Sequence, residues 1–255
     1  MKSSALFAVL SAAVLGISSL YAADPAPKTA QKKKAPATLE QETGVATRPR
    51  MNKRHTKRIE EKKAYAQANG EKVKILMLGD SITHQWEYPR AKQVHAKYIA
   101  PYAVLNLGCS GDRTYHTLWI VEKSGILELI KPQLVTIMIG TNNRFRPEAT
   151  ADGIKRIVDG VRKRYPEAKI LLYAIFPRGA DNTDPLRINN DKVNDIIKNF
   201  CDGKNVIWVD IRKNFLTADG ILEKSMMPDL LHPRDYKGYS VWGESLLPYF
   251  EKYCK

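Results

Sequence analysis

Residues 73–83 read Val-Lys-Ile-Leu-Met-Leu-Gly-Asp-Ser-Ile-Thr, an apolar run that ends in glycine, aspartate and serine. A short aliphatic run without polar alternation is typical of a strand that is buried on both faces of a parallel sheet. The polar residues that follow indicate the end of that strand and the start of a helix. At this junction Ser81 can cap the helix, or it can act as a nucleophile at the end of the strand.

Four further apolar runs follow along the chain, with amphipathic segments between them. The expected strands are residues 73–78, 103–107, 134–139, 169–175 and 206–209. The expected helices are residues 51–69, 86–98, 114–130, 148–165, 186–200 and 236–253. This alternation predicts a three-layer, doubly wound α/β domain with about five parallel strands. Ligands of such domains bind at the carboxyl ends of the strands, so the residues just after each strand are the candidates for function.

The first 50 residues differ in composition from the predicted domain. Lys2, an apolar stretch over residues 5–20 and small residues before Asp24 predict a secretory signal peptide over residues 1–23, and hence a secreted or periplasmic protein. An uncleaved membrane anchor is the less favoured alternative, because the apolar stretch is short. Residues 24–50 are rich in Pro, Ala and Lys without apolar periodicity, which predicts a disordered linker. Residues 51–255 form the expected domain.

The charge of the chain is unevenly distributed. The net charge is +14, and residues 24–70 carry +7 of it. Such a basic segment is most often a solvated linker, but it also suits electrostatic contact with the cell envelope or with acidic glycans. Export argues against nucleic acid as the main partner. The sequence does not indicate an oligomeric state.

Three cysteines are too few for a disulfide framework, and their spacing predicts no metal site. If one disulfide bond forms, Cys201 with Cys254 is the favoured pair, because each follows a predicted helix near the end of the domain. Cys109 instead lies beside the candidate site described next. No residue pattern calls for a cofactor.

The residues after the predicted strands supply the parts that acyl transfer requires. Ser81 can be the nucleophile, and its own N–H can donate to the oxyanion. Gly108 offers a second backbone N–H, and the side-chain amide of Asn142 offers a third donor. His232 can act as general base, and Asp229, three residues earlier, can orient its ring. If each residue is considered alone, a helix cap, a turn or a surface position is the simpler interpretation.

These residues resemble the four sequence blocks of the GDSL or SGNH hydrolase family. The matching blocks are Gly79-Asp80-Ser81, Gly108, Gly140-Thr141-Asn142 and Asp229-Leu230-Leu231-His232. The resemblance covers about residues 51–253, and it implies a flavodoxin-like three-layer fold, no metal, a triad of Ser81, Asp229 and His232, and an oxyanion hole formed by Ser81, Gly108 and Asn142. Cys109 departs from the pattern, where a smaller neighbour is expected, and it changes the expected pocket wall.

Further stretches are similar to one branch of this family. They are Asn106-Leu107-Gly108, Leu118-Trp119, Gly140-Thr141-Asn142-Asn143, Pro177-Arg178-Gly179 and Leu230-Leu231-His232. The branch contains the catalytic subunits of platelet-activating-factor acetylhydrolase, and many bacterial carbohydrate O-acetylesterases share its blocks. The resemblance therefore implies an esterase without naming its substrate.

Several neighbouring residues admit two interpretations. Asp80 lies beside Ser81, but it is expected to form structural hydrogen bonds. His84 is a rival base that lacks an adjacent carboxylate, which makes a pocket-wall position the better prediction. His116 is expected in a helix, and His55 and His95 are expected at the surface.

Four residues near the strand ends could bind substrate. They are Trp86, Arg144, Phe145 and Arg178. Aromatic faces suit sugar rings, and arginines suit carboxylates. The alternative is that the aromatic residues pack against helices and the arginines are solvated.

The sequence thus predicts a secreted or periplasmic serine esterase that hydrolyses acetyl esters, with a carbohydrate ester as the favoured substrate. A lipid or phospholipid acetylhydrolase would use the same catalytic residues. A glycan-binding protein built on an inactive hydrolase domain, and an acyltransferase, are the remaining alternatives.

Overall fold

A computed structural model describes residues 49–50, 52–233 and 236–254. The predicted signal peptide and most of the predicted linker lie outside these residues. No helix within the described part of the chain combines the length and the apolarity that crossing a membrane requires.

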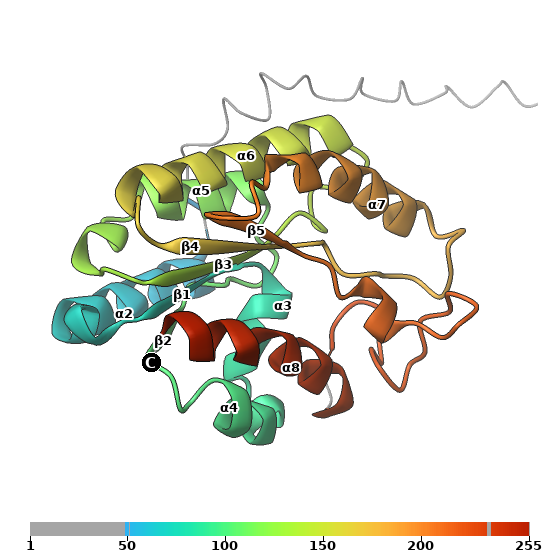
Figure 1. Ribbon diagram of the computed structural model, residues 1–255, viewed down its shortest axis with the longest axis horizontal. Helices are drawn as coiled ribbons and strands as arrows, with labels where there is room; N and C mark the ends of the chain where they lie inside the picture. The colour runs from blue at the N-terminus through green and yellow to red at the C-terminus, as the bar shows by residue number, and fades with distance from the viewer. Residues whose placement is uncertain (1–48, 51, 234–235, 255) are drawn as a thin grey trace, which may run out of the picture. The chain divides into compact units, whose positions relative to one another are not determined.

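Five parallel strands form the centre of the fold (Figure 1). In chain order they are β1 (Ile75–Gly79), β2 (Val104–Asn106), β3 (Leu134–Met138), β4 (Lys169–Tyr173) and β5 (Val206–Val209), and they lie side by side in the order β2-β1-β3-β4-β5. In register, Ile75 of β1 lies beside Val104 of β2 and Leu134 of β3. Every residue of β1 and β3 is buried, as expected for strands that are covered on both faces.

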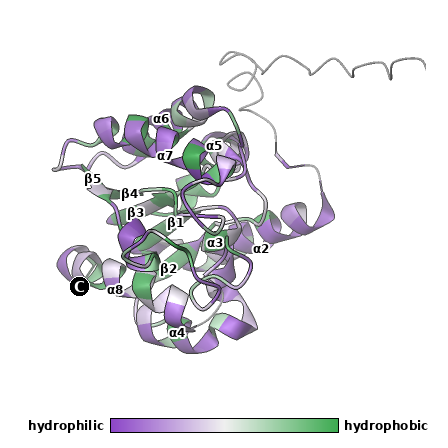
Figure 2. Cartoon of the chain, turned by 90° about the vertical axis from the view of Figure 1, so that its right-hand side faces the viewer, coloured by the Kyte–Doolittle hydropathy of each residue, from purple (hydrophilic) through white to green (hydrophobic). Residues whose placement is uncertain are grey.

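Alternate residues of each strand enter two separate hydrophobic cores, which makes the fold three-layered. Val135 and Ile137 of β3 pack with apolar residues of α2 (Lys53–Asn69), α5 (Thr114–Lys123), α6 (Pro147–Arg164) and α7 (Pro185–Ile197). Leu134 and Met138 pack on the opposite face with α4 (Lys92–Tyr98) and α8 (Tyr236–Tyr253). Figure 2 shows the hydrophobic strands enclosed by helices whose outer faces are hydrophilic. The predicted fold class is confirmed.

Two predicted helices are interrupted. The segment expected as one helix over residues 86–98 forms the short 3-10 turns Gln85–Glu87 and Pro89–Ala91 before α4 begins. Tyr88 has extended dihedral angles because the residue before a proline avoids the helical region. The helix expected over residues 114–130 ends at Lys123, where Gly125 takes a positive φ of 71°, and a 3-10 turn over Leu127–Leu129 follows.

The cysteines do not form the suggested disulfide bond. All three are free thiols. Cys201 packs against the core on the α6 and α7 face of the sheet, whereas Cys254 packs against the core on the α8 face. The sheet separates the two residues, so the pairing of Cys201 with Cys254 is wrong for this fold.

Candidate active site

Ser81 lies at the point where β1 ends, as the first residue of the short helix α3 (Ser81–His84). The side chain of Asp80 caps this helix, because its Oδ1 accepts the N–H of Ile82 at 3.0 Å. The first N–H groups of a helix have no intrahelical acceptor, so the N–H of Ser81 is available to an incoming oxygen atom. One residue can thus supply a nucleophile and a hydrogen-bond donor.

His232 connects Ser81 to Asp229 through both of its ring nitrogens. Its Nε2 lies 2.8 Å from Ser81 Oγ, and its Nδ1 lies 2.7 Å from Asp229 Oδ2. Asp229 Oδ1 also accepts the backbone N–H of His232 at 2.9 Å, so one carboxylate holds both the ring and the backbone. This arrangement places the proton of a neutral imidazole on Nδ1 and leaves Nε2 to accept the hydroxyl proton of Ser81.

The turn that carries His232 has a strained backbone. Leu230 adopts a φ of +55°, which is uncommon for a residue with a branched side chain. The backbone N–H of Gly179, in the loop after β4, donates to the carbonyl of Leu230 at 2.9 Å. The loop after β4 therefore holds the turn in place, and residues 229 and 232 reach the nucleophile from a distant part of the sequence.

Gly108, in the loop after β2, has a different role from the predicted one. The N–H of Gly108 already donates to Asn106 Oδ1 at 2.8 Å. A Cβ atom at Gly108 would lie 2.6 Å from the Cβ of Thr83, so the glycine serves the close approach of α3 to this loop. Gly108 is thus structural here, and the donor assigned to it from the sequence is not available.

Gly111 has a free donor in the same loop. Its φ is +80°, and its N–H has no acceptor within the described part of the chain. The side chain of Asn142, in the loop after β3, donates one amide proton to the carbonyl of Asp112 at 2.9 Å, beside Gly111. The second amide proton of Asn142 remains for a ligand. Sequence analysis missed Gly111 because it could not show which glycine N–H was already engaged.

The four proposed substrate-binding residues lie in different environments. Trp86 is fully buried, and it packs against Tyr239 with ring centroids 4.6 Å apart, so it is a core residue. Arg144 and Phe145, after β3, both have positive φ angles, and Phe145 is 61% exposed. Arg178, after β4, donates to Thr141 Oγ1 at 3.1 Å and thereby connects the loops after β3 and β4.

Two buried groups beside Ser81 have shifted pKa values. Burial raises the pKa of Asp80 to about 7, the nearby Asp112 carboxylate adds to the shift, and the Ile82 N–H and Arg178 oppose it. Burial lowers the pKa of His84 to about 4, with a further contribution from Arg58. The Nδ1 atom of His84 accepts the N–H of Ser110 at 3.3 Å and lies 3.0 Å from its hydroxyl, so His84 is positioned in a side wall and not as the base.

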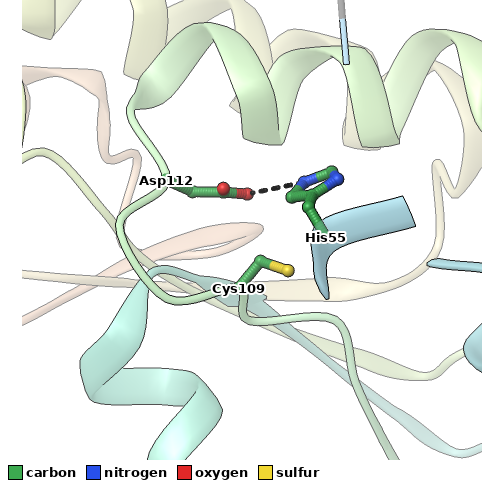
Figure 3. Close-up of side chains that lie close together, drawn as sticks. All are labelled: His55, Cys109 and Asp112. Atoms are coloured by element: carbon green, nitrogen blue, oxygen red, sulfur yellow. Dashed lines mark ion pairs between the residues drawn. The ribbon is translucent and has the colours of Figure 1, made fainter. Parts of the chain in front are cut away.

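His55 is buried, although a surface position was expected, and only 4% of it is exposed. Its Nε2 lies 3.5 Å from Asp112 Oδ2, and Cys109 Sγ is close to both (Figure 3). These three ligand atoms lie within 4.8 Å of one another, a grouping that could hold a metal ion. Arg50 Nη1 already brings a positive charge to within 3.9 Å of Asp112, and burial raises the pKa of the Cys109 thiol to about 12. We interpret the group as a contact between α2 and the loop after β2.

The helical pattern could have revealed the burial of His55. It lies four residues before Ile59, and Ala66 follows seven residues later, so the three residues share the inner face of α2. The prediction treated the segment as charged throughout and overlooked this face. His116 lies in α5, as predicted, and His95 is half-buried in α4.

Comparison with known proteins gives concordant matches. The sequence model of the GDSL-like lipase/acylhydrolase family matches residues 77–239. The chain is 36% identical over 160 residues to platelet-activating factor acetylhydrolase IB subunit alpha2 of Rattus norvegicus, which covers 62% of this chain and 68% of the relative. It is 33% identical over 172 residues to subunit alpha1 of Bos taurus, with coverage of 66% and 71%.

Solved structures share the fold at lower sequence identity. A GDSL-like lipase from Bacteroides thetaiotaomicron superimposes with a TM-score of 0.63 at 18% identity, over 77% of this chain and 97% of that one. An acetylxylan esterase from Geobacillus stearothermophilus superimposes with a TM-score of 0.56 at 20% identity, over 70% and 94%.

Proposed function

The chain belongs to the GDSL-like lipase/acylhydrolase family and is an ester hydrolase, and from this premise we propose that it removes acetyl groups from carbohydrates through an acyl-enzyme on Ser81. The observation that supports this mechanism most directly is the hydrogen-bonded chain from Ser81 Oγ through His232 to Asp229, with distances of 2.8 and 2.7 Å. This chain has the polarity that moves a proton away from the serine hydroxyl.

In the proposed reaction Ser81 Oγ attacks the acetyl carbonyl carbon while its proton passes to His232 Nε2. The N–H groups of Ser81 and Gly111 and the second amide proton of Asn142 stabilise the oxyanion. When the bond between the carbonyl carbon and the sugar oxygen breaks, His232 donates the proton to the departing alcohol. A water molecule then attacks the carbonyl carbon of the acyl-enzyme and gives its proton to His232 Nε2. The bond between this carbon and Ser81 Oγ breaks, His232 returns the proton to Ser81 Oγ, and acetate leaves. Asp229 keeps the ring oriented and stabilises its positive charge in both steps.

The carbohydrate assignment depends on the surroundings of the site. Phe145 presents an exposed aromatic face at the end of β3, two residues beyond Asn143, and aromatic faces suit the apolar face of a sugar ring. The fold of the acetylxylan esterase is consistent with such a substrate. The names of the sequence relatives favour a second candidate, an acetylated phospholipid. Secretion remains part of the proposal on the composition of residues 5–20 alone.

The test compares Ser81→Ala with wild type on an acetylated xylose oligomer and on acetyl and long-chain lipid esters. Loss of the nucleophile is expected to reduce kcat by about 10⁴-fold or more. Ser225→Ala is a matched control, because this serine is exposed on a loop and its hydroxyl donates a hydrogen bond to Glu223. Equal rates for Ser81→Ala and wild type would exclude the mechanism, whereas a wild-type rate that rises with acyl length would favour the lipid candidate.

A further inference from the structure

A pocket of about 440 Å³ lies beyond the carboxyl end of β2, at one end of the sheet. We call it the β2-end pocket. Its charged and polar lining includes Arg50, Lys53, Arg54, Arg58, His84 and Tyr88, with Cys109 and Ser110 of the loop after β2. No acidic residue and no aliphatic residue within the described part of the chain lines it. Its volume lies in the range of small-molecule binding sites.

The cations of this pocket differ in how far their charges are compensated. Arg58 is fully engaged, because it donates to the carbonyls of Gly108 and Asn106 and to Glu87. Arg50 donates to the carbonyl of Ser110 and lies near Asp112.

Lys53 and Arg54 are exposed, and within the described chain neither makes a hydrogen bond or an ion pair. The pocket therefore contains two cationic side chains that are free to meet an anion.

Lys53 and Arg54 also lie in the first turn of a helix, where positive charges are unfavourable. α2 begins at Lys53 after the cap Asn52, whose Oδ1 accepts the N–H of His55 at 2.8 Å. The first turn contains no acidic residue, and the helix dipole makes positive side chains unfavourable at this end. A bound anion would interact favourably with the dipole and with both side chains. The structure thus carries an unfavourable arrangement that an anionic ligand would relieve.

The rest of the lining indicates the kind of molecule that carries the anion. Tyr88 Oη lies 3.3 Å from Ser110 Oγ, and His84 Nδ1 is occupied by Ser110, which leaves the proton of the neutral ring on Nε2 as a donor. Hydroxyl and imidazole donors suit sugar hydroxyl groups. No aliphatic side chain of the described chain lines the pocket, so the side-chain groups that it presents suit a polar ligand better than an acyl chain.

The β2-end pocket adjoins the candidate catalytic centre. His84 follows Ser81 by three residues on α3, about 4.5 Å along a helix axis. Ser110, in the pocket wall, directly precedes Gly111, whose N–H we place in the oxyanion hole. The pocket and the catalytic centre thus share α3 and the loop after β2, which is the placement that a neighbouring sugar of the same substrate requires.

We propose that the β2-end pocket binds the carboxylate of an acidic sugar, so that the preferred substrate is an acetylated glycan that contains uronic-type acids. Lys53 and Arg54 pair with the carboxylate, and Tyr88 and His84 contact sugar hydroxyl groups. This inference rests on the proposed function and specifies that its substrate is anionic.

The first test measures binding without turnover, so that it does not depend on esterase activity. Calorimetry with the full chain carrying Ser81→Ala compares a galacturonate trimer with a galactose trimer. We expect the acidic trimer to bind at least about tenfold more tightly and the preference to disappear in Lys53→Glu/Arg54→Glu. The control Lys163→Glu/Lys192→Glu makes the same change in net charge at exposed positions on α6 and α7, and it should keep the preference.

The second test measures wild-type kinetics on the acetylated forms of both trimers. The ratio of kcat/KM for acidic over neutral substrate should fall at least about tenfold in Lys53→Glu/Arg54→Glu and stay unchanged in the control. Equal binding of both trimers, or equal loss in both double variants, would overturn the pocket assignment. Tighter binding of anionic phospholipid vesicles than of the acidic trimer, lost in the same variant, would overturn it in favour of a membrane. If the protein bound the acidic trimer preferentially but did not turn over either acetylated trimer, only the proposed function would be refuted.

Discussion

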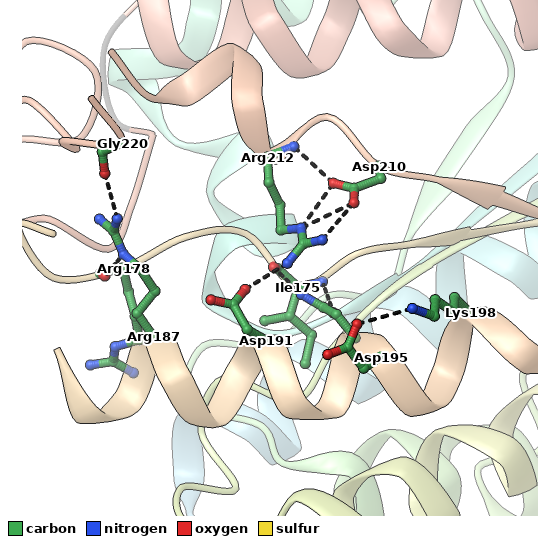
Figure 4. A network of polar contacts seen from close by, with 10 residues as sticks. Ile175, Arg178, Arg187, Asp191, Asp195, Lys198, Asp210, Arg212 and Gly220 are labelled. Carbon is green, nitrogen blue, oxygen red and sulfur yellow. Dashed lines mark hydrogen bonds and ion pairs between the residues drawn. The ribbon is translucent and has the colours of Figure 1, made fainter. Parts of the chain in front are cut away.

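The two ends of the sheet carry pockets of similar size. Both arginines of one pocket are paired, whereas one of the three arginines of the other has no partner within the described chain. The pocket beyond β4 and β5, which we call the β5-end pocket, measures about 490 Å³ and is lined by Arg187, Asp191, Asp210 and Arg212 among others. There Arg187 donates to the carbonyls of Arg178, Gly179 and Gly220. Arg212 pairs with Asp191 and Asp210 (Figure 4). In the β2-end pocket, Arg54 has no such partner within the described chain.

This difference distinguishes cations that stabilise the fold from cations that can bind a ligand. A guanidinium that meets backbone carbonyls and carboxylates holds loops together and has little capacity left for a ligand. An exposed cation without partners adds little to stability, but it can bind an anion at low desolvation cost. Two carboxyl groups, that of Asp210 in the β5-end pocket and that of Asp80 after β1, differ in a similar way. Although burial raises the pKa of Asp210, hydrogen bonds from Arg212 bring it below its usual value, whereas the buried, poorly partnered Asp80 is raised to about 7.

The largest expected effect is on Asp80. Its folded pKa of about 7 lies above the unfolded value of 3.8, so the folded state holds the proton more tightly. The free energy of unfolding should therefore fall as pH rises from about 4 to 7, by as much as about 4 kcal/mol, and then level off. Asp80→Asn keeps the acceptor for the Ile82 N–H and should remove this fall, as measured by urea unfolding between pH 4 and 8.

Asp210→Asn, in the β5-end pocket, is the control for this pH dependence. Its lowered pKa stabilises the fold above the unfolded pKa, and this contribution is lost as the medium becomes acidic. At neutral pH, Asp210→Asn should have a lower free energy of unfolding than the wild type, and Asp80→Asn should have a higher one. Both differences should shrink on acidification. If the Asp80→Asn curve ran parallel to that of the wild type, the buried carboxyl would not titrate as described.

The extent of sequence prediction also differs between local and distant interactions. The strands followed from short aliphatic runs, because burial on both faces leaves few polar residues in a strand. The positions of Ser81, Asp229 and His232 followed from their order along the chain. The sequence left open whether Trp86 binds substrate or packs against helices, because its burial depends on Tyr239 and Trp242, more than 150 residues away.

The glycine donor of the proposed oxyanion hole could not be predicted from the sequence for a related reason. Gly108 and Gly111 lie three residues apart in one loop, and either could offer an N–H. The side chain of Asn106 takes the N–H of Gly108, and no periodicity or spacing encodes that bond. Sequence patterns thus located the loop, and a single side-chain hydrogen bond decided which of its glycines remained free.

The second prediction compares one arginine from each pocket. Arg187 is only 3% exposed, and its side chain satisfies three backbone carbonyls. Arg187→Ala should lower the free energy of unfolding by about 3 kcal/mol, because buried acceptors lose charged donors. Arg54→Ala should change it by less than about 0.5 kcal/mol. Thermal and urea unfolding of both variants measure the difference, and equal effects would remove the distinction between the two pockets.

The smallest expected effect concerns Lys53, and it has the opposite sign. A glutamate in the first turn of α2 interacts favourably with the helix dipole that opposes the lysine, so Lys53→Glu should stabilise the fold by about 0.5 kcal/mol. Urea unfolding at low ionic strength should show the gain, and 1 M salt should reduce it, because exposed charges are screened. Lys163→Glu, near the end of α6, should instead destabilise, because a negative charge there opposes the dipole. A loss of stability in Lys53→Glu would mean that the lysine has a structural role. A gain would show that a residue unfavourable for the helix occupies the rim of the β2-end pocket, which is the expected signature of a site kept for binding.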